Sequence, residues 1–322
     1  MTKAKVAISW NSSCGGCDES IVDLEEKILD IASKVEFVLW PCAMDFKYSD
    51  VESLADQEIT AALINGGIQN THQEHIARML REKSKYVIAF GSCACMGGVP
   101  SLANLTNKQE IYNVSYLDSP TVVNPDKIVP LEECSVDGKK LTLPEMYQTL
   151  YKLDDIIEVD YYLPGCPPTA EMIADTLGAL LSGELPEKGS VLASNKSLCG
   201  SCDRNDTKPD NISIKKIIRI HEIEADPDTC FLAQSVMCMG PATRDGCDYP
   251  CVRGNMPCTG CLGPVSGADQ GAKMIATLGG ILEGDDEKGA GVVLDGVVDP
   301  AGTFYRYSVS ASFLGRKREE DV

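Results

Sequence analysis

Cysteine is concentrated in one part of this 322-residue chain. Of its fifteen cysteines, eight lie between residues 199 and 261. These eight are Cys199, Cys202, Cys230, Cys238, Cys247, Cys251, Cys258 and Cys261. Cysteine at this density has three common explanations: a disulfide scaffold, structural zinc sites or iron–sulfur clusters. Each ties the backbone together differently, so the choice among them constrains the fold of the whole segment.

A disulfide scaffold fits this chain poorly. Such frameworks belong to short secreted domains that cannot bury a core, whereas a chain of 322 residues can bury one. The N-terminal sequence MTKAKVAISW has none of the charged, apolar and cleavable regions of a secretory signal. We therefore expect a cytoplasmic protein with reduced thiols.

Charge and hydropathy exclude other classes of protein. The 48 acidic and 29 basic residues give a formal net charge of -19, which disfavours nucleic acid and anionic lipid as partners. No run approaches the roughly 18 apolar residues of a spanning helix, and the mean hydropathy is -0.09. We expect no membrane span, and the acidic balance weakens a zinc-finger interpretation of the cysteines.

The first 185 residues alternate between short apolar runs and helical patterns. Strands are expected over residues 5–10, 35–40, 61–67, 85–90 and 156–163. Helices are expected over residues 18–33, 71–83 and 169–181, with an irregular stretch over 101–140. This alternation predicts an α/β fold with a doubly wound parallel sheet.

A polar, turn-rich segment over residues 184–197 separates two domains, predicted as 1–185 and 186–322. Residues 199–263 are rich in Gly, Pro, Asp and Asn. We expect an irregular domain there that lacks a core of its own and is held by metal centres and a partner. Further on, we expect a helix over 268–282, extended segments over 291–299 and 304–313, and a solvated end at 315–322.

Four cysteines of the first domain follow expected strands: Cys14 and Cys17, Cys93, and Cys166. The carboxyl ends of parallel strands meet at one crevice, so these thiols should converge. A cubane cluster takes four thiolates, and the glycines of GGC, GSC and PGC allow backbone N–H groups to point at sulfur. The CGGC motif alone would fit a redox dithiol or half a zinc site equally well.

The remaining cysteines and the histidines are weaker candidates. Cys95 competes with Cys93 as a ligand, whereas Cys42 and Cys134 have no partners at useful spacing and are expected to be inert thiols. His72 and His75 are expected on a solvated helix face, and His221 in a structural, strand-like segment. No nucleophile, base and acid set is present in the sequence.

The eight C-terminal cysteines divide into two groups of four in about 35 ways. Local spacing favours one group of Cys247, Cys251, Cys258 and Cys261 and a second of Cys199, Cys202, Cys230 and Cys238. Exchange of ligands between the groups is an alternative, because two-cluster ferredoxins exchange their last cysteines. Zinc remains the rival metal for these thiols.

The motifs CGGC, GSCACMGG, LPGCPPT, CGSC, CFLAQSVMCMGPATRDGC, CDYPC and CTGCLGP together resemble the small, electron-transferring subunit of cytosolic nickel–iron hydrogenases. That group includes the methyl-viologen-reducing, heterodisulfide-reductase-linked enzymes and the sulfhydrogenases. The resemblance covers nearly the whole chain up to about residue 266. It implies an oxidoreductase acting on hydrogen, with the nickel–iron centre in a separate large subunit and an iron–sulfur or flavin subunit as electron acceptor.

The resemblance also implies a flavodoxin-like domain with a proximal 4Fe-4S cluster, followed by an irregular iron–sulfur domain with two more. The proximal ligands would be Cys14, Cys17, Cys93 and Cys166. The medial ligands would be Cys247, Cys251, Cys258 and Cys261, and the distal ligands Cys199, Cys202, Cys230 and Cys238. Membrane-bound relatives use a histidine at the distal site and lack one medial cysteine, places that Cys199 and Cys251 fill here, so three 4Fe-4S clusters are expected.

Two other functions remain open from the sequence. A subunit of a complex-I-like quinone reductase shares the GCPP-type domain, but that family has adjacent cysteines in place of CGGC and no C-terminal cluster domain. A non-enzymatic zinc-binding interaction module is the second alternative. Asn65 departs from the hydrogenase pattern, because an acidic residue is expected there in many relatives.

Overall fold

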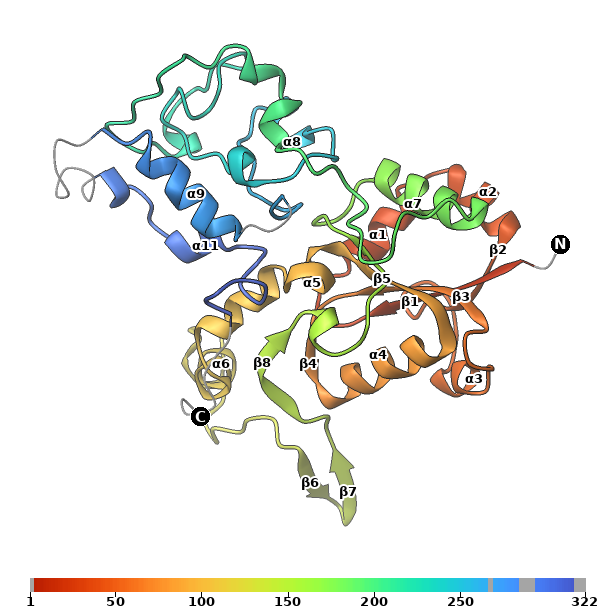
Figure 1. The fold of residues 1–322 in the computed structure, drawn as a ribbon. Coiled ribbons are helices and arrows are strands. Elements are labelled where there is room, and N and C mark those ends of the chain that lie inside the picture. Colours follow the sequence, from red (N-terminus) through yellow and green to blue (C-terminus); the bar gives the residue numbers. More distant parts are fainter. Residues whose placement is uncertain (1–2, 266–268, 284–292, 316–322) are drawn as a thin grey trace.

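The computed structural model describes residues 3–265, 269–283 and 293–315 (Figure 1). Its centre is a five-stranded sheet in which all neighbouring strands are parallel. The strands are β1 (Ala4–Trp10), β2 (Val35–Leu39), β3 (Ile59–Asn65), β5 (Ser84–Phe90) and β9 (Tyr161–Leu163). Their order, β2-β1-β3-β5-β9, is the flavodoxin-like order of a doubly wound fold, so the predicted fold class is confirmed.

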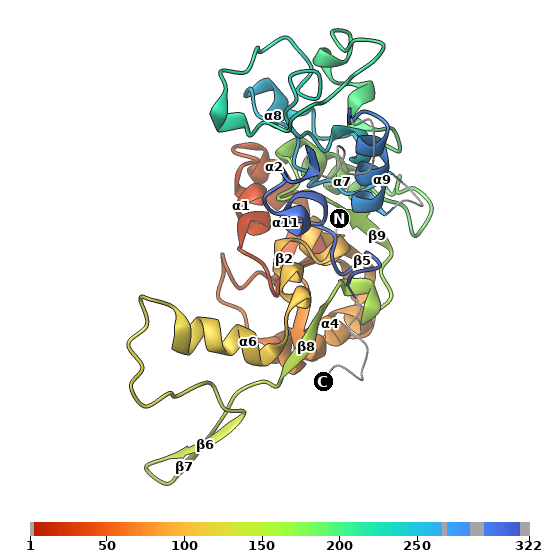
Figure 2. The same ribbon diagram turned by 90° about the vertical axis from the view of Figure 1, so that its left-hand side faces the viewer.

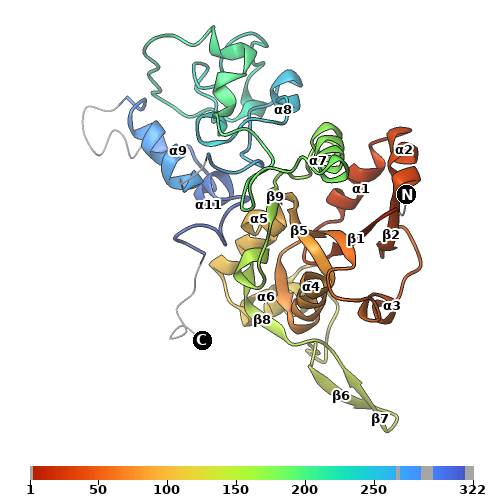
Figure 3. The ribbon, with the colours of Figure 1, turned by 45° about the vertical axis from the view of Figure 1, so that its right-hand side comes forward.

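Helices cover both faces of the sheet, as Figures 1 and 3 show. One face carries α1 (Gly16–Val22), α2 (Lys27–Lys34) and α7 (Ala170–Ser182), and the other carries α3 (Tyr48–Glu52) and α4 (Thr71–Lys83). Alternate residues of β1 pack against the two layers of helices. Val6 and Ile8 pack under α1 and α7, while Ala7 between them packs on the other face of the sheet. Burial on both faces explains the continuous apolar runs of these strands.

Two helices match their predicted ranges and have recognisable caps. The Asn70 side chain accepts a hydrogen bond from the Gln73 N–H at the start of α4, and Thr169 accepts one from Met172 at the start of α7. Gly183 ends α7 with a φ of 77°. The expected helices over 71–83 and 169–181 are confirmed within one residue at each end.

The single helix predicted over 18–33 is wrong. The chain forms α1 and α2 with a break between them, where Glu25 adopts a φ of 53°. The turn places Leu24, only 2% exposed, in the core beside Ile21. The strand predicted over 156–163 is also too long, because β9 covers only Tyr161–Leu163. The turn Leu153–Asp155 and an irregular segment with the buried Ile157 and Val159 precede it.

The stretch predicted to be irregular over 101–140 contains local structure. It includes the turn Val99–Leu105, α6 (Lys108–Asn113), the turn Val114–Asp118 and the hairpin of β6 (Glu133–Val136) and β7 (Lys139–Thr142). The hairpin projects from the body of the molecule (Figure 2). The next strand, β8 (Met146–Tyr151), returns and pairs antiparallel with β4 (Ile68–Asn70).

The cysteine-rich part lies beyond the carboxyl edge of the sheet (Figure 1). Its elements are short: the turns Leu198–Gly200, Asp203–Asn205, Ile220–Glu222 and Gly240–Ala242, then α8 (Pro250–Arg253), α9 (Gln270–Gly279) and α11 (Pro300–Phe304). The prediction that this part lacks its own core is wrong, because Phe231, Met239, Met274 and Leu278 form a buried cluster. The spacing of these residues is irregular, which hides them from a search for periodicity.

The C-terminal segment returns to the first domain instead of forming the predicted extended strands over 304–313. The segment forms successive turns there. The Gly98 N–H donates to the Tyr307 carbonyl, and the Ser310 hydroxyl donates to the Leu150 carbonyl at 2.7 Å. Residues 293–299 are helical at 293–294 and then form turns and irregular structure, while 291–292 and 316–322 lie outside the described ranges. The segment after residue 185 runs beside β9, with Leu192 donating to Tyr162, and the 1–185 and 186–322 division stays a prediction.

Within the described ranges, no helix has both the length and the apolar character needed to cross a bilayer.

A buried ion cluster ties β9 and the following segment to α4. The Asp160 side chain is 1% exposed and lies 2.6 Å from Arg81 Nη1, 2.6 Å from Lys188 Nζ and 2.8 Å from the Val87 N–H. Burial acts to raise the pKa of Asp160, but the two cations and the N–H outweigh it, and the net pKa is lowered. The ionised carboxylate is therefore the stabilising form.

We expect Asp160→Asn to lower the free energy of unfolding by about 3 kcal/mol, because it leaves two cations without their partner. The folded pKa lies below the unfolded one, so this contribution is present above the unfolded value and is lost as pH falls through the folded value. Denaturant unfolding at neutral and acidic pH measures both effects. The control is Asp56→Asn, which breaks a pair with Lys83 whose carboxylate is 68% exposed and which should cost much less stability than Asp160→Asn. Equal losses for the two variants would contradict the assignment.

Candidate functional site

Four thiols of the first domain gather at the carboxyl edge of the sheet. Cys14 follows β1, Cys17 lies on α1, Cys93 lies on α5 (Gly91–Met96) and Cys166 follows β9. The Cys17 thiol interacts electrostatically with the other three, and Cys93 interacts with Cys14 and Cys166. Cys17 and Cys93 are buried, whereas Cys14 and Cys166 are exposed, so the group opens to the outside on one side.

Burial and crowding determine the protonation of this group. Burial raises the pKa of Cys17, and burial together with the neighbouring thiols raises the pKa of Cys93 to about 12. Four thiolates this close would repel one another in a poorly solvated site. A bound metal centre would supply the positive charge that keeps them deprotonated.

Backbone groups line the same site. The Gly16 N–H donates to Cys14 Sγ at 3.4 Å, and the Val99 N–H donates to the Cys93 thiol. Gly91 has a φ of 83°, and a Cβ at this position would lie 2.3 Å from Cys17 Sγ. Only glycine therefore fits between β5 and the Cys17 thiol.

The three remaining cysteines lie apart from this group. Cys95 points into the core and donates to the Ala89 carbonyl at 3.3 Å, and its thiol neighbour is Cys93. Cys42 is exposed and hydrogen-bonds to Asp18, and Cys134 lies on the exposed strand β6.

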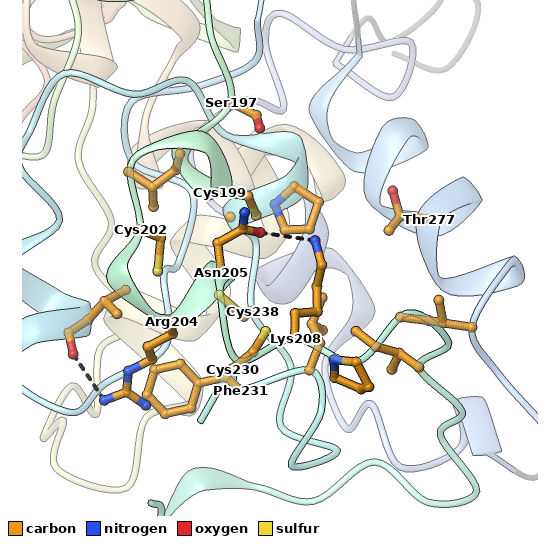
Figure 4. Close-up of a pocket in the computed structure, with 18 of the residues that line it drawn as sticks. Ser197, Cys199, Cys202, Arg204, Asn205, Lys208, Cys230, Phe231, Cys238 and Thr277 are labelled. Atoms are coloured by element: carbon orange, nitrogen blue, oxygen red, sulfur yellow. Dashed lines mark hydrogen bonds between the residues drawn. The ribbon is translucent and has the colours of Figure 1, made fainter. Parts of the chain in front are cut away.

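A second group of thiols lines a cavity of about 340 Å³ in the cysteine-rich part. Figure 4 shows the sulfur atoms of Cys199, Cys202, Cys230 and Cys238 turned toward the same space. Cys199 and Cys238 flank Gly240, with sulfurs 3.3 and 3.6 Å from where its Cβ would be. The other walls are mainly apolar and include Leu198, Phe231, Leu232, Val252 and Ile281.

A lysine faces this cavity at close range. Lys208 donates to Asn205 Oδ1 at 3.0 Å beside the thiols (Figure 4). Burial raises the pKa of Cys199 to about 11, and the Lys208 ammonium opposes this shift. The cavity therefore combines an apolar wall with a nearby positive charge.

The third group lies between the other two. The Cys261 thiol interacts with Cys247, with Cys166 of the first group and with Cys251. The Cys258 thiol interacts first with Cys238 of the second group and then with Cys261. Burial raises the pKa of Cys261 to about 12 and also raises that of Cys258. Cys251 is exposed on α8, and the Tyr249 N–H donates to the Cys247 thiol.

Electrostatic interactions place the three groups in a row. The Cys166 thiol raises the pKa of the Cys261 thiol and its backbone N–H lowers it, so the first group adjoins the third. The Cys238 thiol raises the pKa of Cys258, so the third group adjoins the second. At each junction, a cysteine of one group therefore lies close enough to act on a thiol of the next.

A polar network that the sequence did not predict lies beside Cys17. The buried Asp18 carboxylate accepts hydrogen bonds from Trp40 Nε1 at 3.0 Å and from Asn65 Nδ2 at 2.6 Å, and Asn65 accepts one from Ser13 at 2.8 Å. Asn65 therefore donates to the Asp18 carboxylate, whereas an acidic residue at position 65 would add a second carboxylate here. The position of Asp18 directly after CGGC is the one sequence signal that could have revealed it.

The histidines lie away from the thiol groups. His72 packs edge-on against Tyr48, and His75 Nε2 lies 3.7 Å from Glu52. His221 is exposed on the turn Ile220–Glu222, so the strand-like structural role predicted for it is wrong. In the described part of the chain, no three His, Cys, Asp or Glu side chains are arranged to hold a single metal ion.

Comparisons with known proteins give one family model and several relatives with hydrogenase names. A family model described as NADH ubiquinone oxidoreductase, 20 Kd subunit, matches residues 14–180. An iron–sulfur subunit of the F420-non-reducing hydrogenase of Archaeoglobus profundus is 36% identical over 97% of this chain and 98% of its own length. A subunit of the F420-non-reducing hydrogenase of Methanothermobacter thermautotrophicus is 34% identical over 99% of this chain and 98% of its own length.

A solved structure shares the fold. A chain of the [NiFeSe]-hydrogenase of Dm. baculatum superimposes with a TM-score of 0.52, covering 85% of this chain and 99% of that one at 17% identity.

We expect Gly91→Ala to lower the free energy of unfolding by about 3 kcal/mol, because it combines left-handed backbone strain with overpacking against Cys17. The matched control is Gly189→Ala, where φ is 86° and nothing lies within 4 Å of the added Cβ. That variant should lose only the strain, about 1 to 2 kcal/mol. Denaturant unfolding of both variants measures the difference, and identical losses would show that Cys17 is not crowded by residue 91.

Proposed function

We propose, since this chain belongs to the family of nickel–iron hydrogenase small subunits, that it relays electrons between a nickel–iron centre in a large subunit and an external acceptor. The chain is thus part of an oxidoreductase acting on hydrogen. The observation that carries the relay is the row of three four-thiol groups, in which Cys166 adjoins Cys261 and Cys258 adjoins Cys238.

The residues present fit three 4Fe-4S clusters. The proximal cluster would be held by Cys14, Cys17, Cys93 and Cys166, the medial one by Cys247, Cys251, Cys258 and Cys261, and the distal one by Cys199, Cys202, Cys230 and Cys238. All donors are thiols, several of which accept backbone N–H groups, and one group surrounds a cavity of about 340 Å³. Such donors and hydrogen bonds to sulfur suit iron–sulfur clusters.

When bound, each cluster stores and releases one electron at a potential set by its surroundings. The chain would hold the sulfurs in place and donate N–H groups to them, and Leu198, Phe231 and Val252 give the distal cavity an apolar wall. Lys208 places a positive charge beside Cys199, which favours the reduced state of that site.

The exposed ligands indicate how the partners are arranged. Cys14 and Cys166 lie on the open side of the first group, with the 48% exposed Trp10 nearby in sequence. The large subunit with the nickel–iron centre would cover this side. An iron–sulfur or flavin acceptor subunit would face the distal group at the other end of the row.

A complex-I-like quinone reductase subunit is the second candidate, and the description of the matching family model favours it. That match ends at residue 180, before the eight clustered cysteines. The relatives matched along the whole chain carry hydrogenase names, which supports the hydrogenase assignment instead.

The metal content provides a direct test. Protein purified without oxygen should contain about twelve irons and about twelve acid-labile sulfides per chain, because three four-iron clusters require them. Chemical analysis of iron, sulfide and zinc gives the answer. Zinc with little iron would support the zinc-binding interaction module and end the relay proposal.

Cys93 and Cys95 form a matched pair of buried cysteines on one short helix. We expect Cys93→Ala to abolish electron delivery from the nickel–iron centre to an acceptor dye, because it removes a proximal ligand. Cys95→Ala should retain most of the activity, since its thiol contacts the Ala89 carbonyl. Hydrogen-dependent dye reduction by the assembled complex measures both. Loss of activity in the Cys95 variant alone would reverse the ligand assignment.

A further inference from the structure

Ser92 connects two domains at the point where two thiol groups meet. It lies on α5 between Gly91 and Cys93 and is 1% exposed. Its hydroxyl donates to the Cys261 carbonyl at 2.5 Å, across 169 residues of sequence, and accepts from the Gly165 N–H at 3.1 Å. The Ser92 N–H also donates to the Gly165 carbonyl at 2.8 Å.

The groups that Ser92 contacts adjoin cysteines of both sites. Gly165 directly precedes Cys166 in the first group, and Cys261 belongs to the third group. The Cys166 and Cys261 thiols also interact electrostatically. The Ser92 hydroxyl therefore holds the loop of Gly165 and Cys166 against the loop of Cys261.

A purely structural role is the simpler interpretation of a buried serine, since most buried hydroxyls satisfy a backbone group. The two partners of Ser92 indicate a further role. One lies beside Cys166 of the first group and the other belongs to Cys261 of the third, so the hydroxyl bridges two cysteine loops. Without its hydroxyl, the Cys261 carbonyl and the Gly165 N–H would both lose a partner in a buried place, and the loops could move apart.

We propose that Ser92 is a positioning residue that sets the spacing of the proximal and medial sites and thereby the rate of electron transfer between them. This inference rests on the proposed function. In that step the cluster held at one of the two sites would lose one electron and the cluster held at the other would gain it, and no bond forms or breaks and no proton is transferred.

The test uses the complex of this chain with its large subunit and compares Ser92→Ala with Ser310→Ala. Ser310 is a matched control because its buried hydroxyl also donates to a distant carbonyl, that of Leu150 at 2.7 Å, away from the thiols. The measurements are iron content, isotope exchange between deuterium gas and water, hydrogen-dependent reduction of methyl viologen, and the magnetic coupling of the reduced clusters by electron paramagnetic resonance. Isotope exchange needs no electrons to leave the large subunit.

We expect Ser92→Ala to keep about twelve irons and to keep isotope exchange within about twofold of the parent. Dye reduction should fall about tenfold, because small displacements of reacting partners have large effects on rate. The coupling between the proximal and medial clusters should weaken. Ser310→Ala should match the parent protein in all four measurements.

Three results would overturn the inference. Dye reduction in Ser92→Ala equal to that in Ser310→Ala would show that the spacing does not depend on Ser92. An equal loss of isotope exchange would place the effect at the large subunit, and failure of Ser92→Ala alone to assemble would make the residue purely structural. Absence of iron from the parent protein would instead refute the proposed function, so the two failures are distinguishable.

Discussion

The construction of the three thiol groups depends on the electrostatic cost of bringing thiolates together in a protein interior. Burial raises the pKa of Cys17, Cys238 and Cys258, one from each four-thiol group, and neighbouring thiols raise it further. The sites are therefore neutral or hold a positively charged centre, since uncompensated thiolates would repel one another. The glycines and the backbone N–H groups around sulfur follow from this constraint, because they bring partial positive charge close to the sulfur atoms.

The parallel sheet explains how distant residues satisfy that constraint. Cys14 and Cys166 lie far apart in sequence, yet both follow strands whose carboxyl ends share one edge. This convergence is predictable from the sequence, because strand-end position depends on alternation of apolar runs, which is a strong signal. The helix predicted over 18–33 failed for the opposite reason: Glu25 in a left-handed conformation interrupts a continuous helical pattern to bury Leu24, and no local signal distinguishes the two outcomes.

Side-chain contacts between residues far apart in the sequence were largely beyond sequence reasoning. Ser92 has no distinctive spacing, and the place of Asp18 after CGGC was its one signal. Their importance depends on Trp40, Asn65 and Cys261, which only the fold brings near. The small core around Phe231 and Met274 was missed because its members come from short elements at irregular spacing. Cysteine spacing by itself left several groupings of the eight C-terminal thiols open, and only a three-dimensional arrangement can choose among them.

The two junctions between thiol groups differ in the kind of hydrogen bond that holds their loops together. Where the third group meets the second, the Met239 N–H donates to the Cys258 carbonyl at 2.9 Å, so the backbone itself links the loops that carry Cys238 and Cys258. Where the first group meets the third, the Ser92 hydroxyl donates to the Cys261 carbonyl and accepts from the Gly165 N–H. Buried backbone groups require hydrogen-bond partners, and at this junction a side chain provides one to each loop. The contact between the sheet and the cysteine-rich part therefore depends on one serine hydroxyl, whereas the contact within the cysteine-rich part depends on the backbone.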